Sequence, residues 1–111
     1  MRKVRLKEGA SLVGLQIEMR QVLIRGDAIY HKHGEELWIT SGTEGEHSPA
    51  SLHPFGYALD LRTRFFGIEQ TKAVAGELRE ALPNAYDVVL HEGSHIHVEY
   101  DLAKEIKRCC S

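Results

Sequence analysis

A hairpin of two β-strands most constrains this chain, and it lies in the segment YDVVLHEGSHIHVEY, residues 86–100. The first part carries two adjacent valines, and HIHVEY at the end alternates polar and apolar residues with the period of a strand. The residues between them, HEGS, include a glycine and have the length of a hairpin loop. One face of the second strand is therefore expected to present His95, His97 and Glu99 together.

Two amphipathic helices and two further strands complete the predicted fold. Apolar residues recur at helical spacing in residues 12–30, where Ser11 can cap the start, and again in residues 68–82. The segment 36–42 is a short apolar strand closed by Ser-Gly, and the segment 57–63 alternates with the period of a strand. This order predicts the α+β class, with a small, mostly antiparallel sheet and two main helices packed on one side of it.

The chain is expected to form a single domain over residues 1–111, because its length is near the common domain size. A polar loop at 43–56, rich in Gly, Pro and Ser, is long for such a domain, which favours a functional role for it. The tail from Leu102 is expected to be a short helix. Cys109 and Cys110 are adjacent and are not expected to bridge each other.

Composition excludes several classes of partner. The hydrophobic fraction of 42% supports one modest core, and the net charge of −2 without a basic tract argues against nucleic acid. No apolar run approaches the ~18–20 residues of a membrane span. The N-terminus has no long apolar core, so we expect no secretory signal and a chain that is cytoplasmic as synthesised.

The seven histidines are not evenly spread. His31 and His33 fall near a predicted helix end, where a cationic imidazole suits the helix dipole, so their role is expected to be structural. The other five lie in two short windows, namely His47 and His53, then His91, His95 and His97.

One pattern in the second window fits a helical zinc motif. The residues from His91 through Glu92 to His95 match H-E-x-x-H, in which a helix places two imidazoles on one side. Here the pattern lies between two predicted strands, and Gly93 and Ser94 inside it disfavour a helix. We therefore reject the helical interpretation.

A site built on strands fits better. His95 and His97 leave the same strand face, about 7 Å apart. Asp60 lies on another predicted strand, and His53 stands where the long loop enters that strand. Two imidazoles and one carboxylate with an open fourth position suit catalytic Zn²⁺. The structural alternative is a solvated loop histidine and an aspartate that pairs with a nearby arginine.

The chain also resembles a known family. Residues 51–60, SLHPFGYALD, are similar to the S-x-H-x-x-G-x-A-x-D signature of the zinc D-Ala-D-Ala carboxypeptidases, a family that includes the vancomycin-resistance dipeptidase and phage endolysins that cut cell-wall peptides. Residues 97–99, HVE, resemble the end of its second signature, in which an acidic residue stands three before a ligand histidine. ITSG, 39–42, is similar to the family's entry into the site, and the resemblance covers about residues 37–101.

The resemblance implies that His53, Asp60 and His97 bind Zn²⁺. It also implies that Gly56 permits a tight approach of the chain and that Ala58 leaves room beside the metal.

The second signature is incomplete here. The position of the general base, three before His97, is Ser94, which cannot take up a proton as a carboxylate does. Glu92, at the hairpin tip, is the nearest carboxylate in that turn and is the expected base. In the alternative register, Glu92-x-x-His95 restores the spacing and makes His95 the ligand. Glu99 is expected to support the ligand shell or to pair with an arginine.

The function implied by the resemblance is zinc-dependent hydrolysis of bacterial cell-wall (peptidoglycan) peptides, of the D-Ala-D-Ala carboxypeptidase or endopeptidase type, at the wall after release. With Glu92 as base, His95 would stabilise the oxyanion. The substrate contacts are expected from His47, Ser51 and Arg62, with Arg64 as an alternative carboxylate-binding residue. Two other hypotheses stay open, namely a catalytically inactive metal- or peptide-binding module of the same fold, and a structural zinc site with His47 or His95 as fourth ligand.

Overall fold

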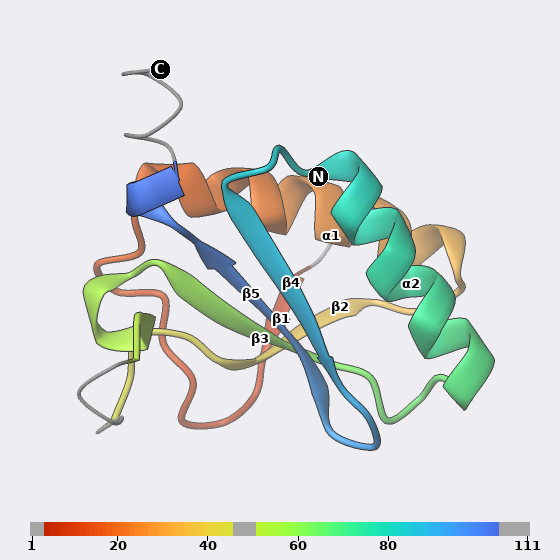
Figure 1. The fold of residues 1–111 in the computed structure, drawn as a ribbon. Coiled ribbons are helices and arrows are strands. Elements are labelled where there is room, and N and C mark those ends of the chain that lie inside the picture. The colour runs from red at the N-terminus through yellow and green to blue at the C-terminus, as the bar shows by residue number, and fades with distance from the viewer. Residues whose placement is uncertain (1–3, 46–50, 105–111) are drawn as a thin grey trace.

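The computed structural model describes residues 4–45 and 51–104. The expected substrate contact His47 and the pair Cys109 and Cys110 therefore lie outside the described residues. Along the chain, the elements are β1 (Val4–Leu6), η1 (Ile17–Met19), α1 (Arg20–Lys32), β2 (Leu37–Ser41), η2 (His53–Phe55), β3 (Ala58–Arg62), α2 (Ile68–Ala81), β4 (Tyr86–His91) and β5 (His95–Tyr100) (Figure 1).

The strands form one sheet in the order β1-β2-β3-β5-β4. Among the described strands, β1 and β2 pair in parallel, and the other neighbouring pairs are antiparallel. Two main helices pack on this sheet, so the predicted α+β class is confirmed. The predicted hairpin is also confirmed, since β4 and β5 pair along their whole length and a turn joins them.

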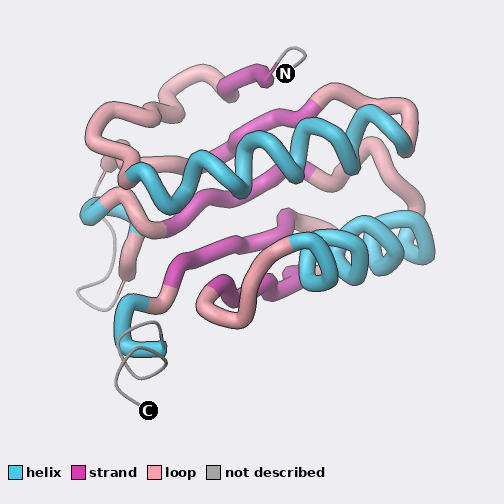
Figure 2. Tube along the Cα trace, turned by 90° about the horizontal axis from the view of Figure 1, so that it is seen from above, coloured by secondary structure: helices cyan, strands magenta, loops and turns pink. Residues whose placement is uncertain are grey.

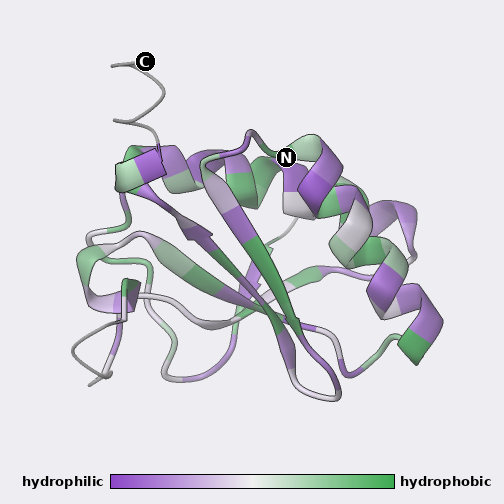
Figure 3. Ribbon diagram, in the orientation of Figure 1, coloured by the Kyte–Doolittle hydropathy of each residue, from purple (hydrophilic) through white to green (hydrophobic). Residues whose placement is uncertain are grey.

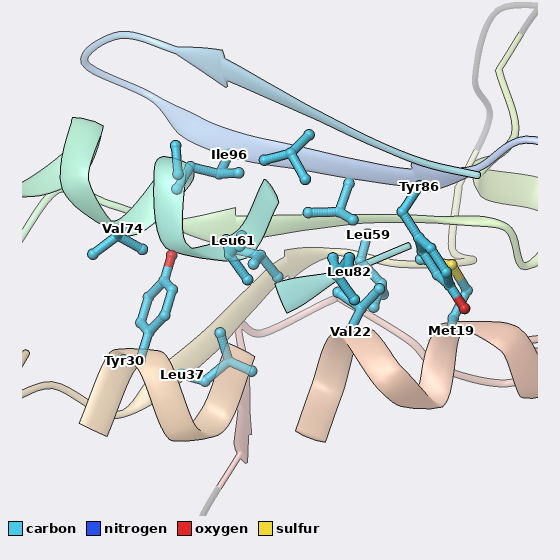
Figure 4. Packing of buried hydrophobic residues seen from close by; sticks show 14 of the residues in the cluster. Met19, Val22, Tyr30, Leu37, Leu59, Leu61, Val74, Leu82, Tyr86 and Ile96 are labelled. Atoms are coloured by element: carbon cyan, nitrogen blue, oxygen red, sulfur yellow. The ribbon is translucent and has the colours of Figure 1, made fainter. Parts of the chain in front are cut away.

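Apolar side chains fill the space between the sheet and the two helices (Figure 4). On β3 and β5, every second side chain belongs to this core, as strand period requires. These fully buried side chains are Leu59, Leu61, Ile96 and Val98. The residues between them, Asp60 and His97 among them, consequently point to the face away from the helices.

Both helices show the mixture of hydrophilic and hydrophobic residues of an amphipathic helix (Figure 3). Seen from above, they run over the strands (Figure 2). From α1 the core takes Val22 and Tyr30, and from α2 it takes Val74 and Leu78. No helix in the described part of the chain is long and apolar enough to cross a membrane.

The start of the first helix was predicted wrongly. The α-helix begins at Arg20 after a 3₁₀ turn, and not near Leu12. Gly14 adopts φ 80°, a left-handed conformation that interrupts a right-handed helix. The Ser11 hydroxyl instead accepts a hydrogen bond from the backbone N–H of Val13 at 3.1 Å, in a local turn.

The other end of α1 agrees with the expectation. His31 lies in its last turn and His33 caps it. The His33 Nε2 atom lies 2.5 Å from a Glu77 carboxylate oxygen of α2, so this histidine joins the two helices. The predicted short helix after Leu102 is represented by residues 102–104, which have helical conformation.

Candidate metal centre

Three side chains from separate elements converge on the face of the sheet away from the helices. Asp60 on β3 and His97 on β5 are direct cross-strand partners. His53 begins η2, the short turn that leads into β3. One potential ligand atom from each residue lies within 4.8 Å of the others, so the group could hold a metal ion.

A backbone carbonyl orients the His53 ring. Its Nδ1–H donates to the Gly42 carbonyl oxygen at 2.8 Å, so Nε2 is the nitrogen that faces Asp60. That nitrogen lies 3.4 Å from Oδ1 of Asp60. The His53 side chain is buried, at 5% exposure, so its ring has little freedom to turn away.

Glu44 in turn fixes Gly42. Its carboxylate accepts hydrogen bonds from the backbone N–H groups of Gly42 at 2.7 Å and Ser11 at 2.9 Å, and from the Ser41 hydroxyl at 2.9 Å. Burial works to raise the pKa of Glu44, but these hydrogen bonds outweigh it and lower the pKa. The long loop thus begins with an ordered carboxylate that positions the carbonyl used by His53.

His97 has a carboxylate at each ring nitrogen. Nδ1 lies 2.8 Å from Oδ1 of Asp60, and Nε2 lies 2.8 Å from Oε1 of Glu99. Since carboxylates only accept hydrogen bonds, both nitrogens must donate, which requires the imidazolium. The hydrogen bond to Asp60 raises the pKa of His97 despite burial, and that to Glu99 raises it further. A cation at Nδ1 would replace a proton and leave the Nε2–H bond to Glu99 intact.

Asp60 is the common partner in this group. Burial works to raise its pKa, but hydrogen bonds with His53 and His97 outweigh it and hold the pKa far below the usual range. Similarly, burial works to lower the pKa of His53, while the hydrogen bond and charge of Asp60 raise it overall. An ionised carboxylate lying between two basic nitrogens is an arrangement that a divalent cation also satisfies.

The expected close approach at Gly56 is present. Gly56 has φ +81°, and a Cβ atom placed there would lie 2.3 Å from the Gly14 carbonyl oxygen. The chain therefore needs glycine both for its conformation and for the contact. This turn fixes the distance between His53 and β3, and Ala58 at the start of β3 is fully buried.

His95 lies beside the group rather than inside it. Its Nε2 is 3.7 Å from Oδ1 of Asp60, while its Nδ1 is 2.6 Å from the Ser94 hydroxyl. The His91 ring stacks on it, with centroids 4.7 Å apart. Burial and the nearby histidines lower the pKa of His95, although Asp60 acts in the opposite direction. This lowered pKa favours the neutral ring of His95, which can take part in hydrogen bonds.

The structure does not bring Glu92 to the group. Glu92 is exposed at the hairpin tip and lines a hollow of about 200 Å³ with Phe66, Ile68 and Thr71, on the side of α2. Val89 is the cross-strand partner of His97. Glu92 follows Val89 by three residues, which corresponds to about 10 Å along the strand.

Of the expected substrate contacts, Ser51 and Arg62 lie near the group. The Ser51 hydroxyl accepts a hydrogen bond from the backbone N–H of His53 at 3.2 Å. Arg62 follows Asp60 by two residues on the same strand face and is the cross-strand partner of His95. Its guanidinium carbon lies 4.4 Å from the Trp38 ring centroid, which is a cation–π contact.

Neither a search of protein-family models nor a search of curated proteins finds a match to this chain. The chemistry of the centre is therefore argued from its own geometry.

Glu44 and the Gly42 carbonyl support this centre and were not predicted. A single glutamate in a polar loop has no periodic signal, although Gly42 belongs to the ITSG segment that resembled the family.

Proposed function

We propose that this chain is a zinc-dependent peptidase that hydrolyses bacterial cell-wall peptides. The observation that carries the proposal is the convergence of His53, Asp60 and His97 beside an open hollow on one sheet face. Two imidazoles and one carboxylate are the donor types of catalytic zinc sites with three protein ligands. Zn²⁺ also fits because each imidazole has an oxygen partner for its other nitrogen, Gly42 for His53 and Glu99 for His97.

A bound zinc ion supplies a water of lowered pKa and polarises the scissile carbonyl. His95 lies next to the ligands with a neutral ring, and it would donate a hydrogen bond to the oxyanion of the tetrahedral intermediate. Ser51 and Arg62 would hold the peptide at either side of the ligand group. Hydrogen bonds hold the three proposed ligands in place before substrate arrives, namely the rings of His53 and His97 and the carboxylate of Asp60.

The proton of the attacking water needs an acceptor. Ser94 stands at the position where the resemblance predicts a carboxylate, and Glu92 is about 10 Å along the strand from the partner of His97. For Glu92 to act as the base, the hairpin tip has to bring it over the sheet face. This placement favours the second candidate function, a metal- or peptide-binding module of the same fold without catalysis.

Turnover separates the two candidates. The zinc-loaded protein is incubated with peptides that end in D-Ala-D-Ala and with L-Ala-D-Glu peptides, and released amines are quantified. The Asp60→Asn variant is the control, because it removes a proposed ligand while keeping the shape of the side chain. Cleavage by the parent and not by the variant supports the peptidase. A parent that binds peptide and cuts none supports the binding module.

A further inference from the structure

The two histidines of the H-E-x-x-H pattern meet at the end of the hairpin, although they do not lie on a helix. His91 is the last residue of β4, His95 is the first residue of β5, and the two are direct cross-strand partners. Their rings stack, with centroids 4.7 Å apart and planes inclined by 28°. Cross-strand neighbours on one sheet face lie as close together as the i and i+4 residues of a helix, so they too can share a ligand. We call these two residues the hairpin histidine pair.

The turn between the strands holds the pair together. The backbone N–H of Ser94 donates to the His91 carbonyl oxygen at 3.0 Å, and Gly93 has φ 75°, which glycine adopts without strain. The two histidines therefore cannot separate without opening the turn. Two nitrogens that bind one zinc ion at about 2.0–2.1 Å lie at most about 4 Å apart, and a modest rotation of rings at this separation provides that distance.

The ring of His91 is available to a ligand. Within residues 4–45 and 51–104, no hydrogen bond or ion pair engages this ring, and its aromatic contacts are the rings of His95 and His97. The residue is exposed, so an ion from solution can reach it. His91 thus differs from His53 and His97, whose ring nitrogens already have oxygen partners.

The groups around His95 are suited to a cation. Oδ1 of Asp60 lies 3.7 Å from Nε2 of His95, and the Ser94 hydroxyl lies 2.6 Å from Nδ1, where it can support the ring of a bound imidazole. Arg62 is the partner of His95 on β3, but its guanidinium packs on the Trp38 ring, with the guanidinium carbon 4.4 Å from the centroid. This positive charge is therefore held by a side chain of β2 and does not occupy the hairpin histidine pair.

The pair is separate from the proposed metal centre. The ligand atoms that lie within 4.8 Å of one another belong to His53, Asp60 and His97, and His91 is not among these residues. The centroid of the His91 ring lies 6.5 Å from that of His97. An ion on the pair would therefore lie beside the first ion without taking either of its imidazoles, as in sites with two neighbouring metal ions.

We propose that the hairpin histidine pair binds a second divalent transition-metal ion of the kind that prefers imidazole, such as Zn²⁺, and binds it more weakly than the proposed metal centre binds the first. Two protein ligands hold the second ion against three for the first, and water completes its coordination. Even a hydrogen bond to a ligand is worth about 10–100-fold in metal affinity, so the second ion should need at least about tenfold more free zinc. It should be lost during desalting.

Resting on the proposed function, the second ion should inhibit hydrolysis when zinc is in excess. A His95 ring that binds the ion through Nε2 has no N–H left on that side for the oxyanion. The pair would thus make turnover sensitive to the concentration of free zinc.

Equilibrium dialysis against buffered free zinc tests the pair without any turnover. Bound zinc per chain is measured in the parent, in His91→Ala, in His53→Ala and in the matched control His31→Ala, which changes an exposed histidine on α1. The parent should take up one equivalent and then a second at higher free zinc. His91→Ala should lose the second alone, His53→Ala should lose the first alone, and His31→Ala should keep both.

A parent without a second equivalent would overturn the proposal. So would a second equivalent that His91→Ala retains or that His31→Ala loses, because the ion would then be bound elsewhere. Loss of both equivalents in His91→Ala, with the fold confirmed by circular dichroism, would place His91 in the first centre and overturn a separate site. A parent that binds the second equivalent and not the first would contradict the proposed metal centre and leave the pair standing.

Peptide cleavage at rising free zinc tests the inhibition. Turnover by the parent should fall over the range of free zinc that fills the second site, and His91→Ala should keep its turnover there. An equal fall in both proteins would exclude inhibition through the pair. A parent that cuts no peptide would contradict the peptidase, while the dialysis would still decide whether the pair binds an ion.

Discussion

Oδ1 of Asp60 lies 2.8 Å from Nδ1 of His97, across the neighbouring strands β3 and β5. The contact follows from the strand register, because the two residues are direct partners and their side chains leave the same face. It supports His97 over His95 as the third ligand of the proposed metal centre. His95 precedes His97 by two residues on β5.

The roles of the two histidines can be separated by mutation. His97→Ala should lose tight zinc binding, because it removes one of three protein ligands. His95→Ala should keep zinc and lose turnover, since its Nε2 is 3.7 Å from Oδ1 of Asp60 and His95 lies outside the proposed ligand group. Zinc affinity by competition with a chelating dye, measured beside peptide cleavage, distinguishes them. The reverse pattern would assign the ligand role to His95.

Glu99 should tune the affinity for zinc without binding it. Its carboxylate accepts the Nε2–H of His97, so Glu99→Gln is expected to weaken zinc binding by about 10–100-fold. Asp87→Asn is the matched control, because Asp87 is the cross-strand partner of Glu99 on β4 and pairs with Lys104 instead. An unchanged Kd in Glu99→Gln, or an equal loss in both variants, would exclude this role.

Zinc binding and metal-free stability should depend on pH in opposite directions. The raised pKa values of His53 and His97 mean that zinc must displace protons, so its affinity should fall by up to about 100-fold per pH unit below both values. In the metal-free protein, the raised pKa of His97 contributes stability that is fully present below about pH 6.5 and is lost as pH rises through the folded value.

The lowered pKa of Asp60 affects stability at the acidic end of the pH range. Its contribution to stability is present above about pH 4 and is lost as pH falls through the folded value. The metal-free protein should therefore gain most from this pair between about pH 4 and 6.5, and Asp60→Asn should flatten that dependence. Chemical denaturation at pH 5.5 and 7.5, with and without zinc, measures both trends. If stability changes with pH in the same way with and without zinc, the assignment of His53, Asp60 and His97 as zinc ligands is contradicted.

A carboxylate at position 94 should raise hydrolysis. Ser94 lies beside His95 and lines the hollow next to the proposed metal centre, so Ser94→Asp puts a base on that side of the hairpin. We expect kcat to increase by about 10²-fold or more, within the usual range of general base catalysis. An increase that is also seen when Asp60 is changed to Asn would not come from the metal centre.

The same variant tests Glu92. If Glu92 is the base of the parent, Glu92→Gln should lower kcat by about 10²–10⁴-fold while zinc content and folding are kept. In the Ser94→Asp background, Glu92→Gln should have little effect, because the new carboxylate replaces it. A parent whose kcat does not change in Glu92→Gln does not use Glu92.

The strands β2 to β5 and the second helix were predictable because each carries its apolar pattern in its own residues. HIHVEY alternates without exception, and β5 has the predicted bounds, His95–Tyr100. β1 was not predicted, since three residues, VRL, are too few to show a period. The start of α1 was misplaced because Leu12 and Leu15 continue the apolar spacing of the helix, while Gly14 breaks the backbone between them.

The candidate site was predictable only in part. The spacing of His53 and Asp60 lies within one loop and strand and is visible in the sequence. The pairing of Asp60 with His97 depends on the register between β3 and β5, which local residues do not specify. Lys7 reaches the hollow next to the proposed metal centre only because β1 pairs with β2, and this contact has no local signal.

The zinc content of the purified chain tests the central claim most directly. The parent and Asp60→Asn are supplemented with zinc, passed over a desalting column and measured by elemental analysis against protein concentration. The parent should hold about one zinc ion per chain, and the variant should hold less than about 0.2, because only two protein ligands remain. A parent with less than about 0.2 equivalents, or a variant that retains as much zinc as the parent, would contradict a metal centre at His53, Asp60 and His97.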